Sequence, residues 1–215
     1  MAPVHLRFTG LARRFGRLAV LRGVDGEVGA GQVLVVTGPN GSGKSTLLRC
    51  LAGLLAPDAG TIDHREEGDD EPLAAAERRL RVGYVAPDLA LYEELTAGEN
   101  LDFFARLRRV ERARGRELLA RLDLPADRPA GALSSGMRQK LRWAWALLHR
   151  PRLLLLDEPF QNLDTTGAAV VGELLAEHLG AAGDSPTPGA AVLAQPTVPT
   201  LDPRFAVADR VELAG

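Results

Sequence analysis

Residues 38–46 read GPNGSGKST and combine three glycines with a lysine and several hydroxyl groups. They fit the pattern G-x-x-x-x-G-K-[ST] and follow an apolar run at residues 33–36. Glycines let the backbone approach phosphates, and successive N–H groups at a helix start form an anion site. We therefore predict a phosphate-binding loop, in which Lys44 reaches the β- and γ-phosphates and the Ser45 hydroxyl coordinates Mg²⁺. The predicted nucleotide-binding residues of this loop are Gly38, Pro39, Asn40, Gly41, Ser42, Gly43, Lys44, Ser45 and Thr46.

Two adjacent carboxylates follow a second apolar run, at residues 153–156. Asp157 and Glu158 then stand at the carboxyl end of a predicted buried strand, where ligands bind in open α/β sheets. We expect Asp157 to hold Mg²⁺ and Glu158 to act as the general base on an attacking water, a role worth about 10²–10⁴ in rate. The alternative is a pair of exposed acids at a helix start, stabilised by the helix dipole.

A third motif, LSSGMRQK, covers residues 133–140. Ser134, Ser135 and Gly136 open an amphipathic helix, and a helix start of this kind can bind an anion. Capping of the helix by Ser134 or Ser135 is expected in any case. One nucleotide does not need two such sites on one chain, whereas two chains facing each other could use both.

These motifs require a scaffold, and the apolar patterning predicts one. Short apolar runs at residues 33–36, 82–85, 153–156 and 190–194 are typical of strands buried on both faces of a parallel sheet. Helical spacing between them predicts an α/β fold. Near the N-terminus, Leu6 and Phe8 alternate with polar residues, which predicts a small antiparallel β flank.

Composition limits the class of protein. The chain has 215 residues, and 26 Lys and Arg against 28 Asp and Glu leave a net charge of −2, which does not favour a general nucleic-acid binder. A single cysteine suits a reducing compartment. We find neither a signal-peptide pattern nor an apolar run of membrane-spanning length. We therefore expect a cytoplasmic protein that meets the membrane only through a partner.

The order of the motifs resembles the ATP-binding subunit of ABC transporters. GPNGSGKST, LSSGM (in place of that family's LSGGQ), LLLLDEP and then QNLD at residues 161–164 follow one another as in that family, and the similarity spans nearly the whole chain. The short length and the SSGM form resemble small exporter-type subunits, including those that serve heme export in cytochrome c maturation. The resemblance implies a single domain over 1–215, with a nucleotide-binding core at 1–87 and 150–215 and a helical subdomain at about 88–149.

The resemblance also implies a mechanism and its partners. ATP and Mg²⁺ bind between two subunits, a homodimer or a heterodimer, so that the phosphate loop of one faces Ser134 and Gly136 of the other. Asp164 crosses the interface, and closure acts on a membrane permease docked near residues 89–92. The subunit then lies on the inner face of the cell membrane, bound through the permease. Phe15 stands where the family has an aromatic residue that stacks on adenine; the alternative is an ordinary buried aromatic.

The sequence departs from the family at two places. Where the family has a glutamine that touches Mg²⁺, this chain has Pro87 followed by Asp88, and Asp88 could bind Mg²⁺ as an oxygen ligand. Where the family has a histidine at the γ-phosphate, Gln195 or Pro196 follows the strand at 190–194. Gln195 can donate a hydrogen bond but cannot carry a positive charge, so we expect slower hydrolysis.

Two functions remain in competition. The first is an ATPase that drives transport, with export favoured over import. The second is a nucleotide-dependent binding or regulatory module with little hydrolysis, which the altered Gln195 and Asp88 positions favour. An arginine-rich stretch is either a solvated helix face or a docking surface for a partner; its members are Arg106, Arg108, Arg109, Arg112, Arg114 and Arg116.

Overall fold

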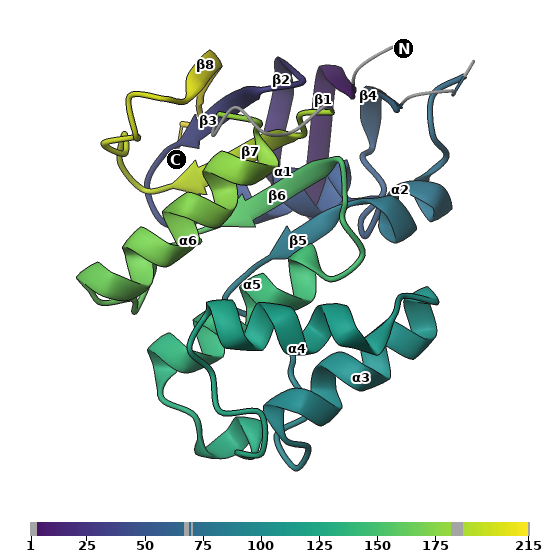
Figure 1. Ribbon diagram of the computed structural model, residues 1–215. Helices are drawn as coiled ribbons and strands as arrows, with labels where there is room; N and C mark the ends of the chain where they lie inside the picture. The colour runs from purple at the N-terminus through teal and green to yellow at the C-terminus, as the bar shows by residue number, and fades with distance from the viewer. Residues whose placement is uncertain (1–3, 67–68, 70, 182–186, 215) are drawn as a thin grey trace.

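The computed structural model describes residues 4–66, 69, 71–181 and 187–214. Its core is a parallel sheet of five strands in the order β5-β6-β7-β3-β8 (Figure 1). The strands of this sheet are β3 (Gln32–Thr37), β5 (Gly83–Val85), β6 (Leu153–Asp157), β7 (Ala190–Gln195) and β8 (Ala206–Glu212). All four pairings within it are parallel, which confirms the predicted parallel core.

Strand β3 separates two hydrophobic cores. Val33 and Val35 face the core that contains α5 (Ser135–Leu147) and α6 (Thr165–His178). Leu34 and Val36 face the other core, with α1 (Lys44–Leu51) and the second sheet. Because successive side chains of a strand point to opposite faces, an all-apolar strand is what two cores require. Accordingly, α6 lies in front of the sheet and α1 behind it (Figure 1).

The predicted antiparallel flank is confirmed. Strands β1 (His5–Phe15), β2 (Leu18–Gly29) and β4 (Ala59–Arg65) form a three-stranded sheet in the order β2-β1-β4. Leu6 and Phe8 are fully buried and pack toward α1. This packing requires a glycine at position 26, since a Cβ there would lie 2.4 Å from the Phe8 ring.

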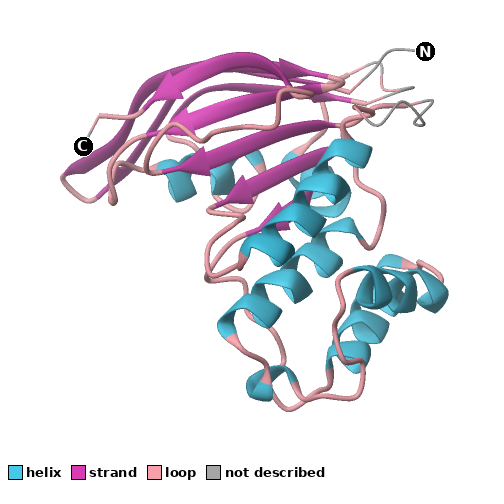
Figure 2. Ribbon diagram, turned by 60° about the vertical axis from the view of Figure 1, so that its left-hand side comes forward, coloured by secondary structure: helices cyan, strands magenta, loops and turns pink. Residues whose placement is uncertain are grey.

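The segment between β5 and β6 is helical (Figure 2). It holds α3 (Ala97–Arg108), α4 (Arg112–Arg121), the short 3₁₀ helix η1 (Ala130–Ala132) and α5, while α2 (Ala75–Arg81) precedes β5. Thr96 starts α3 by accepting a hydrogen bond from the Glu99 backbone N–H at 3.1 Å, and the Glu99 carboxylate accepts one from the Thr96 N–H at 2.9 Å. These two bonds satisfy backbone donors that a helix start leaves free.

Helix α5 is bound to the loop that follows β6. The Pro159 carbonyl accepts hydrogen bonds from Trp143 Nε1 at 2.9 Å and from Gln139 Nε2 at 3.0 Å. Trp143 is fully buried and Gln139 nearly so. One carbonyl therefore connects the helix that carries the LSSGM motif to the strand that carries Asp157.

Among the residues that the structure describes, none of the helices has the length and apolar character needed to span a membrane.

Trp143→Phe should lower the free energy of unfolding by about 1–3 kcal/mol, because it removes a buried hydrogen bond and leaves a void. Urea denaturation followed by circular dichroism measures this change. Leu107→Ala is the control, since Leu107 is 65% exposed and its loss should cost under about 0.5 kcal/mol. Equal stability of the Trp143→Phe protein and the wild type would contradict the coupling of α5 to the loop after β6.

Candidate nucleotide-binding site

The phosphate loop connects β3 to α1, as the sequence predicts. Gly43 is the N-cap of α1 and has a left-handed backbone with φ of 101°. A Cβ at this position would also lie 2.7 Å from Val20 Cγ1. Glycine is therefore required here twice over, by the backbone angle and by the approach of β2.

Lys44 is directed into the loop. Its side chain is nearly buried, and Nζ donates to the Gly38 carbonyl at 2.7 Å and to the Pro39 carbonyl at 2.9 Å. An ammonium group has three donors, so one remains for a further acceptor. Lys44 thus stabilises the loop through two hydrogen bonds, and its third N–H is left to donate to a phosphate oxygen.

A cavity of about 440 Å³ lies over the phosphate loop. Its walls come from β1, β2, the loop itself and the end of β6; they are formed by Phe15, Val20, Asn40, Gly41, Gly43, Lys44, Ser45, Thr46 and Glu158. Phe15 is 48% exposed, so the alternative that it is an ordinary buried aromatic is wrong. The Arg13 guanidinium lies 5.0 Å from the centroid of its ring. An exposed ring at the rim of this cavity is suited to stacking on a base.

A second cavity, of about 310 Å³, adjoins the first and shares Ser45 and Glu158 with it. Arg49, Pro87, Asp88, Asp157 and Gln161 complete it. Oxygen atoms of a hydroxyl and of carboxylates are the donors that Mg²⁺ prefers, so the residues present fit this ion.

Asp157 is the most buried carboxylate of the site, at 3% exposure. Burial raises its pKa, and the nearby charges of Glu158 and Asp88 act in the same direction. A hydrogen bond from the Ser45 hydroxyl and the charge of Lys44 oppose this rise. The ionised form is therefore destabilised in the empty site, and a bound cation would compensate for it.

Asp88 lies in this second cavity and forms an ion pair with Arg49. The Asp88 side chain is 59% exposed, and exposed pairs contribute only about 0–1 kcal/mol. Little free energy therefore opposes a turn of Asp88 from Arg49 toward a metal ion. Pro87 is exposed beside it and supplies no side-chain acceptor.

Glu158 is held by its backbone and by a neighbour. Its φ of 46° is left-handed, and its N–H donates to the Ala194 carbonyl at 2.9 Å. Its Oε2 accepts a hydrogen bond from Gln161 Nε2 at 2.8 Å. The sequence motifs do not point to Gln161, although it lies only three residues after Glu158. A left-handed non-glycine residue costs free energy and often occurs at functional sites.

Gln195 is the last residue of β7 and is half-buried. It pairs with Thr37 of β3, directly before the phosphate loop. Its side chain does not line either of the two cavities. The structure therefore brings its backbone, but not its side chain, to the site.

The LSSGM residues lie apart from both cavities. Ser134 caps α5 by accepting a hydrogen bond from the Met137 N–H at 3.2 Å, and Ser134 and Ser135 are exposed. Gly136 approaches the loop after β6 so closely that a Cβ would lie 2.7 Å from the Asn162 carbonyl oxygen. Asp164 is exposed and caps α6 by accepting from the Gly167 N–H at 2.7 Å.

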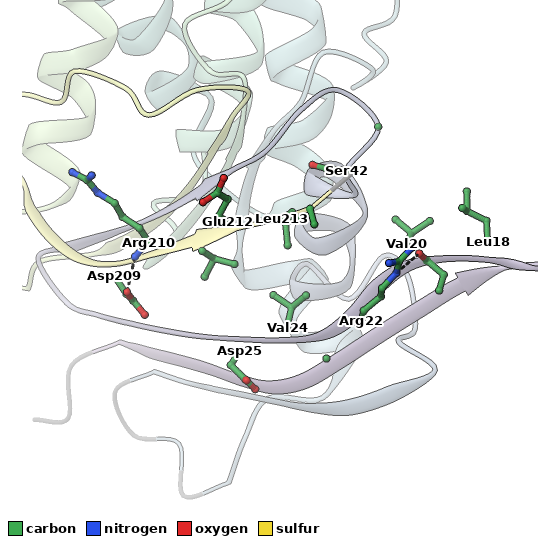
Figure 3. A pocket seen from close by; sticks show the side chains of 15 residues that line it. Leu18, Val20, Arg22, Val24, Asp25, Ser42, Asp209, Arg210, Glu212 and Leu213 are labelled. Carbon is green, nitrogen blue, oxygen red and sulfur yellow. Dashed lines mark hydrogen bonds between the residues drawn. The ribbon is translucent and has the colours of Figure 1, made fainter.

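A further hollow of about 440 Å³ lies behind the phosphate loop, between β2 and β8 (Figure 3). Of the predicted nucleotide-binding residues, only Gly41 and Ser42 reach it. Ser42 Oγ is buried and has no hydrogen-bond partner among the described residues. Since Lys44, Asp157 and Glu158 face elsewhere, this hollow is not the candidate site.

Asp157→Asn should have opposite effects on the empty and the loaded protein. Because the pKa of Asp157 is raised in the folded protein, the folded state binds more protons than the unfolded state at pH values between the two pKa values. The contribution of Asp157 to the free energy of unfolding therefore falls as the pH rises through this range. At neutral pH and without metal, the neutral amide should therefore increase the free energy of unfolding, and this gain should shrink toward acidic pH. With Mg-ATP at 100 times Kd, wild type should gain about 2.7 kcal/mol and the variant much less.

Urea unfolding with and without Mg-ATP tests both effects. Asp127→Asn serves as the matched control, because Asp127 is exposed and lies outside both cavities. A variant that is less stable than wild type when empty would contradict the role of burial at Asp157.

Known proteins resemble this chain in sequence. The family profile described as "ABC transporter" matches residues 21–161. The "Daunorubicin resistance ATP-binding protein DrrA3" of Streptomyces coeruleorubidus is 41% identical over 84% of this chain and 58% of its own. A "Sulfate/thiosulfate import ATP-binding protein CysA" of Bradyrhizobium diazoefficiens is 44% identical over 72% and 47%. The "Nod factor export ATP-binding protein I" of Ralstonia nicotianae is 38% identical over 79% and 54%. The chain thus spans about half the length of these relatives.

Solved structures resemble the fold. A "Structure of ATP binding subunit of ABC transporter" has a TM-score of 0.74 and 27% identity, and the match covers 88% of this chain and 79% of that one. The cbiO1 protein of Clostridium perfringens, described as part of the ABC transporter complex cbiONQ, has a TM-score of 0.70 and 26% identity over 89% and 78%. Since the family profile covers well over half of the residues, the chain belongs to the ABC transporter family of ATP-binding proteins.

Proposed function

We propose that this chain binds and hydrolyses Mg-ATP and thereby powers a separate membrane permease. The observation that carries the proposal is the meeting of Lys44, Ser45, Asp157 and Glu158 around two adjoining cavities at the carboxyl edge of one parallel sheet. Phosphate-binding and metal-binding groups there lie next to a carboxylate that can accept a proton. A protein that only binds nucleotide has no need of that last group.

In this proposal Glu158 accepts a proton from the water that attacks the γ-phosphate. Gln161 orients the Glu158 carboxylate through its 2.8 Å hydrogen bond. Lys44 neutralises charge on the transferred phosphate, and Ser45 with Asp157, joined by Asp88, would hold Mg²⁺. The bound ion supplies further neutralisation of the phosphate charge.

The proposal includes a dimer of ATP-binding subunits. Its support is the exposure of Ser134, Ser135 and Asp164 away from the chain's own phosphate cavity, where they are free to face a second chain. We further propose that the chain divides into a core of 1–87 and 150–215 and a helical subdomain of about 88–149. The division falls at the loops that join β5 and β6 to the helices between them.

The proposed permease contact lies on the helical side. A cavity of about 290 Å³ beside Leu89 is bordered by Leu54, which is 54% exposed, and by Trp145. Nearby, Tyr92 is 47% exposed. Apolar side chains exposed together support a protein contact. A subunit docked here would be cytoplasmic and peripheral, on the inner face of the membrane.

Export is the direction we propose, and its support is the similarity to a resistance protein and to a Nod factor export protein. A sulfate/thiosulfate import protein matches with comparable identity. Transport by the chain co-purified with its permease in vesicles decides between the two directions.

The second candidate function is a regulatory module that binds ATP with little hydrolysis. Two observations favour it: Gln195 lies outside both cavities, and Asp88 is paired with Arg49. Both candidate functions predict ATP binding, but only the ATPase predicts rapid ATP hydrolysis. The rate of ATP hydrolysis therefore distinguishes them.

Glu158→Gln should reduce the steady-state rate of Mg-ATP hydrolysis by about 10²–10⁴-fold, because the amide cannot accept a proton. Phosphate release measures the rate, and equilibrium titration with ATP should show binding within a few-fold of wild type. Glu111→Gln, at the exposed N-cap residue of α4, is the control and should leave the rate unchanged.

No hydrolysis by the wild type, alone and with its co-purified permease, together with tight ATP binding, would reject the ATPase in favour of the regulatory module. A Glu158→Gln protein as active as wild type would reject Glu158 as the base.

Gln195→His should raise the rate of hydrolysis, because an imidazolium can neutralise developing charge on the γ-phosphate and glutamine cannot. Gln195→Ala should lower the rate if the glutamine hydrogen-bonds a phosphate oxygen in the loaded protein. Single-turnover hydrolysis at several pH values measures both. A rate that is the same in all three proteins would show that residue 195 takes no part in the reaction.

A further inference from the structure

A further cavity, lined by arginines, lies at the opposite edge of the parallel sheet from the phosphate loop. It has a volume of about 350 Å³, and Arg150, Pro151 and Arg152 line it directly before β6 begins, as Gly189 does before β7. Side chains of α4, α5 and α6, together with Thr187, complete its walls. The lining residues precede their strands, whereas the phosphate loop follows β3, so the two cavities lie at opposite ends of the parallel strands.

The lining of this cavity is strongly positive. Four arginines border it, at positions 114, 121, 150 and 152, against one carboxylate, Glu177, which leaves a net charge of +3. His178 adds no charge at neutral pH, because burial lowers its pKa to about 4. Its Nε2 lies 3.0 Å from the Ala190 carbonyl oxygen.

The single carboxylate is already neutralised. Arg121 binds Glu177 with two hydrogen bonds, of 2.8 and 2.5 Å. Arg114 binds Glu117 at 2.6 Å. By contrast, Arg150 and Arg152 have no ion-pair partner in the part of the chain that the structure describes. Among the described residues, the charges of Arg150 and Arg152 in this concave wall therefore lack a counter-charge.

Buried donors in the wall also lack acceptors. Arg114 Nε and Arg152 Nε are each buried with no hydrogen-bond partner among the described residues. A buried donor without an acceptor costs free energy, more so when the group is charged. A ligand with several anionic oxygens would balance the unpaired charge of this wall.

We propose that this cavity is a second anion site, which binds the phosphate chain of a small di- or triphosphate. Guanidinium groups match phosphate oxygens with paired, charge-assisted hydrogen bonds. The negative charge of such a chain would balance the charges of Arg150 and Arg152, and 350 Å³ is within the usual range for small-molecule sites. The site shares no residue with the phosphate-loop cavities and does not depend on the proposed ATPase function.

Calorimetric titration with inorganic pyrophosphate tests the site in a Lys44→Ala background without Mg²⁺, where binding at the phosphate loop is weakened. The expected result is one site per chain. Adding Arg150→Ala and Arg152→Ala should weaken that binding about tenfold or more, because two charge-assisted partners are lost. Arg22→Ala with Arg116→Ala removes the same charge from exposed positions outside the cavity and should change the affinity by less than about twofold.

Three outcomes would overturn the proposal. The first is that the Lys44→Ala protein does not bind pyrophosphate. The second is that the Arg22→Ala, Arg116→Ala control pair weakens pyrophosphate binding as much as the Arg150→Ala, Arg152→Ala pair. The third is that a hexaglutamate peptide binds more tightly than pyrophosphate and that Arg150→Ala with Arg152→Ala abolishes the binding of this peptide. The last result would assign the cavity to an acidic polypeptide. If the double variant fails to fold, as judged by circular dichroism, Arg150→Ala alone carries the test, because Arg150 is exposed and its removal leaves no void.

Discussion

Burial of β6 on both faces is the constraint on which the site depends. The strand lies between β5 and β7, and all five of its residues are buried. A strand covered on both faces can have polar groups only at its ends, so Asp157 stands where the apolar run stops. Parallel pairing then brings the ends of β3, β6 and β7 to the same edge. The phosphate loop, the two carboxylates and the backbone of Gln195 meet there because they share that edge.

The same burial makes the empty site unfavourable. Asp157 loses hydration, Glu158 adopts a left-handed backbone, and Lys44 uses two of its donors on loop carbonyls. Each feature lowers the stability of the empty protein or occupies a group that a ligand would use. Such costs are common where activity requires a preorganised site. Nucleotide and metal are the partners that would satisfy these groups.

Helix α5 joins the helical segment to this edge through specific contacts. Trp143 and Gln139 share the Pro159 carbonyl, and Gly136 lies against Asn162. The start of α5 therefore cannot shift without disturbing the loop that directly follows Glu158. A movement of α5 during closure of two subunits would displace the loop after Glu158, because Trp143, Gln139 and the Pro159 carbonyl that they bind are buried.

Sequence alone determined the parallel core, the antiparallel flank and the loop between β3 and α1, because each rests on a local pattern of apolar residues or glycines. Asp157 at the end of its strand was predicted for the same reason. Only the tertiary structure decided that Phe15 is exposed at the cavity rim, that Arg49 pairs with Asp88 and that the Gln195 side chain lies outside the cavities. Only the tertiary structure places arginines of α4 and of the loop before β6 around one cavity. These arrangements join residues far apart in the chain, and which side chains meet depends on how helices pack across the sheet, which no local pattern encodes.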